Sequence, residues 1–396
     1  MTSADHDIDI TDIDLFSGEN LTDPYPIYRR LRDTGASVWV SALECWAVPR
    51  YDDVRASLQD WETYSSAQGV GMNDDINELS GGTVLASDPP LHDQLRGVLA
   101  DRLGPRAIRS LSGPIREQAD ALVESLVERG TFDAVTDLAR VFPPTIIADL
   151  VGLPGEIRPQ LLEWGDAVFN TLGPLNDRSM NVMPVVGDQF QWLYSLDGSE
   201  LREGSMGRAI FDAADAGLIS RESAPALLSA YTSASMDTTV NALGSAVALF
   251  AQHPDQWSGL RVDRTLVPSA FDEVLRFESP LQMFTRVATR DHRLGEHDIS
   301  SGDRLIMMYG SANRDERHFG DTAGSFDITR DASDHVAFGS GLHGCAGQGL
   351  ARLEAHSVLN ALADRVVSFA IDGEPVRHLN NLVRGFGSLS VSVERA

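Results

Sequence analysis

Residues 335–356 read HVAFGSGLHGCAGQGLARLEAH, and the chemistry of this glycine-rich stretch decides the fold. Beginning at Gly339, three glycines follow the G-x-G-x-x-G order of a dinucleotide-binding turn. The same stretch contains Cys345, and the chain has only one other cysteine, Cys45. The two interpretations predict different enzymes, so the surrounding sequence has to separate them.

The dinucleotide-binding interpretation requires a βαβ unit around the glycines. HVAF would be its first strand, VVSFAID its second, and Asp372 the acid that contacts a ribose. Only residues 373–396 follow, and the rest of the chain lacks the alternating strands and helices of a parallel sheet. Because an isolated G-x-G-x-x-G pattern is weak, we disfavour this interpretation.

A metal-binding thiolate explains more of the stretch. Glycines lack a Cβ atom and let the backbone approach a flat cofactor closely. We predict a helix from Cys345 to about Asp364, whose first N–H groups would favour the thiolate. A single cysteine without C-x-x-C or H-x-x-H companions excludes structural zinc and iron–sulfur clusters. Haem iron held by one cysteine remains, whereas an unreactive buried cysteine would leave Phe338 and His343 unexplained.

The composition limits the class of protein. The 396 residues include 58 acidic side chains and 32 basic ones, all arginine, for a formal net charge of −26. Such acidity argues against nucleic acid and anionic membranes as partners. No signal peptide pattern and no run of 18 apolar residues is present, so we expect a cytoplasmic protein. We expect residues 1–20 to form a disordered acidic tail and residues 21–396 a single domain.

Hydrophobic periodicity predicts a mainly α fold. From residue 51 to about residue 260, apolar residues recur every three or four positions. Alternating patterns at 36–50 and after residue 280 predict small antiparallel sheets. Residues 223–252 are apolar or small on all faces, which predicts a long, central, buried helix.

The cysteine stretch resembles the haem-binding signature of the cytochrome P450 family, F-G-x-G-x-[HR]-x-C-x-G. The matching residues are Phe338, Gly339, Gly341, His343, Cys345 and Gly347. The resemblance implies a helix-rich single domain with haem b between the central helix and the cysteine-bearing helix. It also implies an oxidoreductase, a haem-thiolate monooxygenase with Cys345 as the axial ligand.

Three further motifs resemble this family in the same order along the chain. Glu273 and Arg276 form its E-x-x-R pair, with Arg330 as the implied third member of a structural triad. ASMDTT in the central helix is similar to [AG]-G-x-[DE]-T, where Asp237 and Thr238 are the implied catalytic pair that delivers protons beside a local widening of the helix. Ala234 is the implied haem contact, and Ser235 replaces the usual glycine. The residues implied to bind the haem propionates are His92, Arg96, Arg286 and His343.

Several stretches resemble soluble bacterial P450s that oxidise para-substituted benzoates and O-demethylate methoxybenzoates. The substrate-pocket residues implied by this resemblance, with Ala234 and Thr238, are Met72, Phe169, Leu172, Phe284, Gln68 and Ser229. Arginines expected for a benzoate align with Gln68 and Ser229, and a carboxylate in an apolar pocket needs a cation. We therefore expect hydroxylation or O-demethylation of a neutral aromatic compound. A hydroxylase of a terpene or natural-product intermediate, a peroxide-driven enzyme and a non-catalytic haem sensor are the alternatives.

The expected partners follow from what the chain lacks. No flavin or iron–sulfur domain is visible, so electrons would come from a separate protein. The resemblance to soluble bacterial P450s implies that this protein is a ferredoxin with its ferredoxin reductase, and that O2 is the second substrate. A basic patch is expected to bind the ferredoxin. Its residues are Arg96, Arg102, Arg106, Arg109 and Arg352. We expect the protein to be a monomer.

Overall fold

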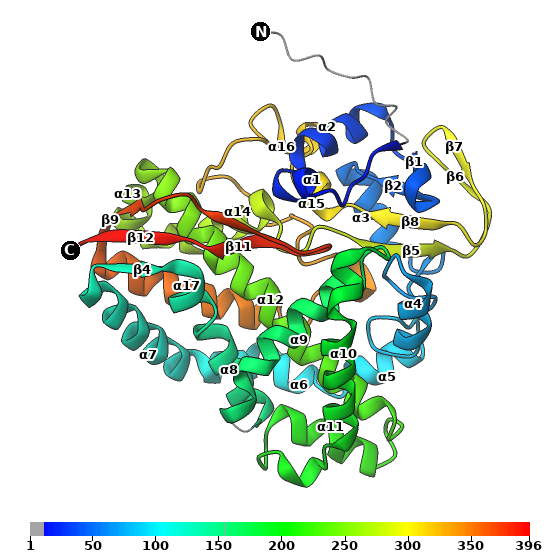
Figure 1. Cartoon of the computed structure of the whole chain (residues 1–396), viewed down its shortest axis with the longest axis horizontal. Helices are drawn as coiled ribbons and strands as arrows, with labels where there is room; N and C mark the ends of the chain where they lie inside the picture. The colour runs from blue at the N-terminus through cyan, green and yellow to red at the C-terminus, as the bar shows by residue number, and fades with distance from the viewer. Residues whose placement is uncertain (1–11, 154) are drawn as a thin grey trace.

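The structure is a computed structural model that describes residues 12–153 and 155–396. Helices make up most of it, and the strands form small separate sheets (Figure 1). The α-helices are α1 (Gly18–Thr22), α2 (Tyr25–Thr34), α3 (Tyr51–Gln59), α4 (Asp74–Ser80), α5 (Leu91–Gly97), α6 (Ala100–Leu103), α7 (Pro105–Arg129), α8 (Phe142–Val151), α9 (Arg158–Thr171), α10 (Asp177–Ser195), α11 (Met206–Asp215), α12 (Ser223–Gln252), α13 (Pro254–Val262), α14 (Val267–Glu278), α15 (Tyr309–Ala312), α16 (Glu316–Phe319) and α17 (Gln348–Arg365).

The largest sheet has the strand order β1-β2-β8-β5-β3, and a second sheet has the order β4-β12-β9. The remaining strands form the pairs β6-β7 and β10-β11. The strands are β1 (Val38–Val40), β2 (Cys45–Val48), β3 (Tyr64–Ser65), β4 (Thr131–Asp133), β5 (Phe284–Ala288), β6 (His292–Leu294), β7 (His297–Ile299), β8 (Arg304–Met307), β9 (Val366–Ile371), β10 (Val376–Leu379), β11 (Arg384–Ser388) and β12 (Ser390–Arg395). The pair β2-β8 differs from the antiparallel pairing that we expect, because the long helical segment between these strands lets them run parallel.

The long helix α12 has the predicted bounds and lies at the centre of the helical layer (Figure 1). It contacts α8, α9, α14 and α17, and its second half is buried on every face. Small side chains such as Gly244 and Ser245 let neighbouring helices approach closely from several directions. A second apolar core lies beside the five-stranded sheet.

The N-terminal segment differs from the expected disordered tail. Residues 1–11 of that segment lie outside the described residues. In the described part, however, Ile13, Leu15 and Phe16 are buried in the core beside the five-stranded sheet, and α1 follows them. Because three apolar side chains here are removed from water, the expectation of disorder up to residue 20 is wrong for this part.

Candidate active site

Cys345 lies in the loop between the 3-10 turn η7 (Gly341–His343) and α17. The backbone is left-handed at Gly339, with φ of 69°, and at Gly341, with φ of 68°. Only glycine fits at Gly341, because an added Cβ would lie 2.5 Å from the carbonyl oxygen of Leu58. The glycines therefore set the path of the chain on the way to the cysteine.

The start of α17 corrects one prediction. This helix begins at Gln348, so Cys345 precedes it instead of occupying its first turn, since Gly344 and Gly347 interrupt helical geometry. The sulfur still accepts hydrogen bonds from the backbone N–H groups of Gly347 and Gln348. Burial raises the pKa of the Cys345 thiol, and these N–H groups and the charge of Arg96 oppose that rise.

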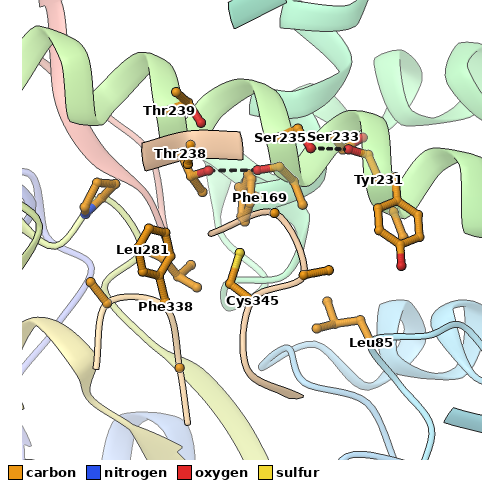
Figure 2. Close-up of a pocket in the computed structure, with 18 of the residues that line it drawn as sticks. Leu85, Phe169, Tyr231, Ser233, Ser235, Thr238, Thr239, Leu281, Phe338 and Cys345 are labelled. Atoms are coloured by element: carbon orange, nitrogen blue, oxygen red, sulfur yellow. Dashed lines mark hydrogen bonds between the residues drawn. The ribbon is translucent and has the colours of Figure 1, made fainter. Parts of the chain in front are cut away.

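A cavity separates the cysteine loop from the middle of α12 (Figure 2). The sulfur of Cys345 points toward α12, and Thr238 projects from this helix toward the loop. The residues singled out from sequence that line the cavity are Arg96, Phe169, Leu172, Ser229, Ala234, Thr238, Phe284, Arg286, Phe338, Gly339, His343, Cys345 and Gly347. The fold thus brings side chains from distant segments around the thiol.

One edge of the cavity concentrates positively charged groups. Arg96 and Arg286 line it, and the rings of His92 and His343 pack edge to face with centroids 4.6 Å apart. Burial, Arg286, His92 and Arg96 lower the pKa of His343 to about 3. Among the described residues, the Nε2 atoms of both histidines are buried without a hydrogen-bond partner. The two guanidinium groups fit the carboxylates of a bound anionic group, and the negative charge of such a group would favour a proton on the orphaned Nε2 of His343, which could then donate to it.

Behind the cavity, Glu273 and Arg276 form a fully buried pair on α14. Arg276 donates two hydrogen bonds to the carboxylate, at 2.6 and 2.8 Å, and further bonds to backbone carbonyls within residues 313–325. Arg330 approaches Glu273 at 3.4 Å. Since buried charges need complete pairing, this triad holds α14 against the segment that leads into the cysteine loop.

Comparison with known proteins assigns the family. The cytochrome P450 family model matches residues 208–365. The chain is also 39% identical over 395 residues to cytochrome P450 CYP199A2 of Rhodopseudomonas palustris, with 97% of this chain and 94% of the relative covered. The protein belongs to the cytochrome P450 family. Among solved structures, CYP109Q5 from Chondromyces apiculatus superimposes with a TM-score of 0.84 at 27% identity, covering 98% of this chain and 99% of that one.

The family defines the coarse chemistry of this P450. It is an oxidoreductase, a monooxygenase whose cofactor is haem with a cysteine thiolate as axial ligand, and Cys345 is that cysteine. The cavity fits this group, because the thiol faces open space while the orphaned histidine nitrogens and two arginines lie at its edge. Within residues 12–153 and 155–396, every helix is too short or too polar to cross a membrane.

Thr238 and Asp237 point in different directions from α12. Thr238 lines the cavity, and its hydroxyl donates to the carbonyl oxygen of Ala234 at 2.8 Å (Figure 2). Ser235 likewise donates to the carbonyl oxygen of Tyr231, at 2.6 Å. The expected local widening of the helix is absent here: α12 is regular through these residues, and both hydroxyls bond to their own helix.

Asp237 lies on the buried side of α12, against α9. Its side chain is 4% exposed and its Oδ2 atom is buried without a partner among the described residues. Burial and the charge of Asp166 raise the pKa of Asp237 to about 7, while His378 and Arg140 act in the opposite direction. His378 lies 2.5 Å from Asp166, and both side chains are partly exposed. The pair therefore acts on Asp237 through its charges, and no hydrogen bond joins it to Asp237 among the described residues.

Two of the residues expected in the substrate pocket do not line the cavity. Gln68 is exposed, and its backbone carbonyl accepts a hydrogen bond from Arg304. The side chain of Met72 packs against the sheet-side core, although its backbone N–H donates to the carbonyl of Leu172, a cavity residue. A loop motif places backbone near a site, but it does not determine where each side chain points.

Several residues that line the cavity were not predicted from the sequence. Glu354 on α17 is 1% exposed, and burial raises its pKa well above the usual range. Tyr231, Leu85 and Leu281 line the cavity walls (Figure 2). Only Glu354 has a detectable sequence pattern, an acid on the inward face of the helix that follows the cysteine; the other three match the core packing of any helical protein.

Proposed function

We propose that this P450 oxidises a small, uncharged aromatic compound by hydroxylation or by O-demethylation of a methoxy group. The apolar wall of the cavity supports this proposal. Phe169, Leu172, Leu281 and Phe284 offer flat and branched apolar surfaces to an aromatic ring. In the described residues, the cationic side chains that line the cavity, Arg96 and Arg286, lie at the edge beside His343. A substrate carboxylate on the apolar wall would lack a paired cation.

The residues around the cavity have distinct proposed roles. Bound haem supplies the one-electron and dioxygen chemistry. Phe338, Gly339, Gly347 and Ala234 would contact its faces, and the propionates would bind at the edge formed by His92, Arg96, Arg286 and His343. Asp237 would hold a proton near neutral pH, and Thr238 would present a hydroxyl to the cavity. Because the two side chains point in different directions, a rotation of Asp237 or a bridging water would carry the proton between them.

Turnover of 4-methoxyphenol tests the substrate class. In O-demethylation, one oxygen atom of O2 enters the methyl C–H bond, and the resulting hemiacetal breaks its C–O bond to give hydroquinone and formaldehyde. The second oxygen atom leaves as water, with two protons and two electrons from the redox partner. We expect formaldehyde and hydroquinone in equal amounts from 4-methoxyphenol, and at least ten times less formaldehyde from 4-methoxybenzoate, whose charge costs more to bury.

The two substrates are compared at equal concentration with the same surrogate redox proteins, and formaldehyde and the aromatic products are quantified. Preferential turnover of 4-methoxybenzoate would contradict the proposed substrate class. Turnover confined to a terpene included in the same panel would favour the alternative function.

The electron donor is proposed to be a ferredoxin that docks beside α7 and α17. Ile108 on α7 faces Gly349 on α17, so the N-terminal part of α7 lies next to the cysteine-bearing segment. Arg106 and Arg109 are exposed there. The other predicted patch members have structural partners: Arg102 donates to the carbonyl of Gly204, Arg96 to that of Gly344, and Arg352 pairs with Asp272.

Charge reversal of the two exposed arginines tests this docking site. We expect the double variant Arg106→Glu/Arg109→Glu to be reduced by an acidic ferredoxin about tenfold more slowly than the parent at low salt. The difference should shrink at high salt, because screening weakens attraction between exposed charges. Stopped-flow reduction kinetics measure both effects. The matched control is Arg29→Glu/Arg293→Glu, which changes the same charge on α2 and β6; equal rates for all three proteins would refute the site.

A further inference from the structure

A buried tyrosine lies beside one of the two arginines at the edge of the cavity. Tyr309 is the first residue of α15, is 2% exposed and lines the cavity. Burial raises the pKa of the Tyr309 hydroxyl, while the charge of Arg286 and a hydrogen bond between the two side chains oppose that rise. Arg286 also lies near His343, whose pKa is lowered by burial and by this guanidinium. Tyr309 therefore belongs to the edge of the cavity that concentrates positive charge.

The antiparallel pairing of β5 with β8 brings Tyr309 to Arg286. Phe284 on β5 pairs with Met307, the last residue of β8, and Tyr309 follows two residues later. Arg286 lies on the same face of β5 as Phe284, because successive side chains of a strand alternate between its two faces. The rings of Phe284 and Tyr309 pack edge to face with centroids 6.3 Å apart. The strand pairing and the ring contact together hold the Tyr309 hydroxyl at the cavity.

The Tyr309 hydroxyl has a proton that no protein group accepts. A guanidinium group only donates, so the phenol oxygen is the acceptor in the bond with Arg286, which is its only partner among the described residues. Tyr51 shows the complete pattern elsewhere in the fold. Its oxygen accepts from Arg55 at 3.1 Å, and its proton is donated to the carbonyl oxygen of Asp334 at 2.7 Å. Since buried donors normally find an acceptor, the Tyr309 proton is available to a ligand in the cavity.

The charge of Arg286 determines which ligand fits. Arg286 is 3% exposed and donates to the carbonyl oxygen of Thr285 at 2.7 Å, but no acid in the described part of the chain pairs with it. A buried guanidinium without a counter-charge is costly, so the ligand at this edge should be an anion. A carboxylate accepts both from Arg286 and from the Tyr309 hydroxyl. The propionates of the haem cofactor are such carboxylates, whereas an uncharged substrate would leave Arg286 unpaired.

We propose that Tyr309 is a haem-binding residue whose hydroxyl donates a hydrogen bond to the propionate that pairs with Arg286. It would add an uncharged donor to the cationic residues and histidines that the sequence resemblance implies at this edge. The inference depends on the haem cofactor and is independent of the class of substrate. A hydrogen bond that stabilises the negative propionate also weakens its electrostatic effect on the iron, so Tyr309 would raise the reduction potential of the haem.

Transfer of haem from the ferric enzyme to excess apomyoglobin tests this bond. Haem should leave Tyr309→Phe about tenfold faster than the parent, the factor that a hydrogen bond to a charged group provides. The reduction potential of Tyr309→Phe, measured by redox titration, should be lower than that of the parent. Tyr28→Phe is the matched control, because Tyr28 is buried on α2 and does not line the cavity. It should keep the parental transfer rate and potential.

Reconstitution with haem dimethyl ester separates the proposed bond from a general loosening of the fold. The two esters carry no charge, and a hydrogen bond to a neutral acceptor is about half as strong as one to a carboxylate. The ratio of transfer rates between Tyr309→Phe and the parent should therefore fall from about tenfold to about threefold or less.

Three results would each overturn the proposal. They are a tenfold ratio that persists with the ester, faster haem transfer from Tyr28→Phe, and an unchanged transfer rate in Tyr309→Phe. If that unchanged rate came with weaker binding of 4-methoxyphenol in a spin-state titration, the hydroxyl would face the substrate instead of the propionate.

Discussion

Replacing Cys345 with serine is expected to abolish oxygenation while leaving the chain folded. The thiolate is the axial ligand, and a serine hydroxyl is a far weaker ligand because it stays protonated at neutral pH. The ferrous–carbon monoxide complex of Cys345→Ser should therefore lose the long-wavelength Soret band of thiolate ligation, and product formation should fall below detection. Far-UV circular dichroism should remain unchanged, because Cys345 lies in a loop and contributes to no helix or strand.

The second cysteine provides a matched control. Cys45 is 2% exposed on β2, and burial raises its pKa to about 12, so it stays a neutral thiol in the sheet-side core. Cys45→Ser should keep the thiolate spectrum and the turnover, at some cost in stability from a buried hydroxyl. Retention of the thiolate band in Cys345→Ser, or its loss in Cys45→Ser, would refute the ligand assignment.

Replacing Asp237 with asparagine is expected to slow product formation about a hundredfold, the lower end of what general acid–base catalysis contributes. With a pKa of about 7, the carboxyl can hold and release a proton near neutral pH, whereas an amide cannot. Substrate affinity should stay within about twofold, since Asp237 does not line the cavity. Steady-state turnover and spin-state titrations separate the two effects. An unchanged turnover would exclude Asp237 from the proton route.

The same substitution should change stability in a pH-dependent direction. The unfolded chain loses the Asp237 proton near its ordinary pKa of 3.8, whereas the folded chain retains it up to about pH 7. Raising the pH between these values therefore destabilises the parent but not Asp237→Asn. Above pH 7 the variant should be more stable by up to about 4 kcal/mol, from about 1.4 kcal/mol for each unit of pKa shift.

Denaturant unfolding at several pH values between 4 and 8 measures this difference. The advantage of Asp237→Asn should disappear as the pH approaches 4. The charged and titratable groups that act on Asp237 are Asp166 on α9, His378 on β10 and Arg140. Asp298→Asn, which removes an exposed acid on β7, is the control and should follow the parent at every pH. A constant difference between Asp237→Asn and the parent would contradict a buried, protonated carboxyl.

Local sequence pattern predicted much of this protein, because the features concerned depend on residues close together in the chain. The bounds of α12 follow from a long run of mostly apolar and small residues. Glu273 and Arg276 are three residues apart on one helix, so their pairing needs only helical geometry. The glycines around Cys345 predicted a close approach of the backbone, although at Gly341 the close neighbour is the backbone of Leu58 and Gln59 on α3.

Other features depended on contacts between distant segments, and only the tertiary structure decided them. Because glycines interrupt helical geometry around Cys345, α17 begins at Gln348. The segment that begins at Ile13 is ordered because its apolar side chains pack in the sheet-side core. Gln68 faces solvent, whereas Gln189, a residue without any motif, reaches two serines on α12. The direction of a side chain across a cavity depends on how two helices pack, and no periodicity within one helix contains that information. Sequence alone therefore determined the chemistry at Cys345, and tertiary packing determined which groups face the substrate.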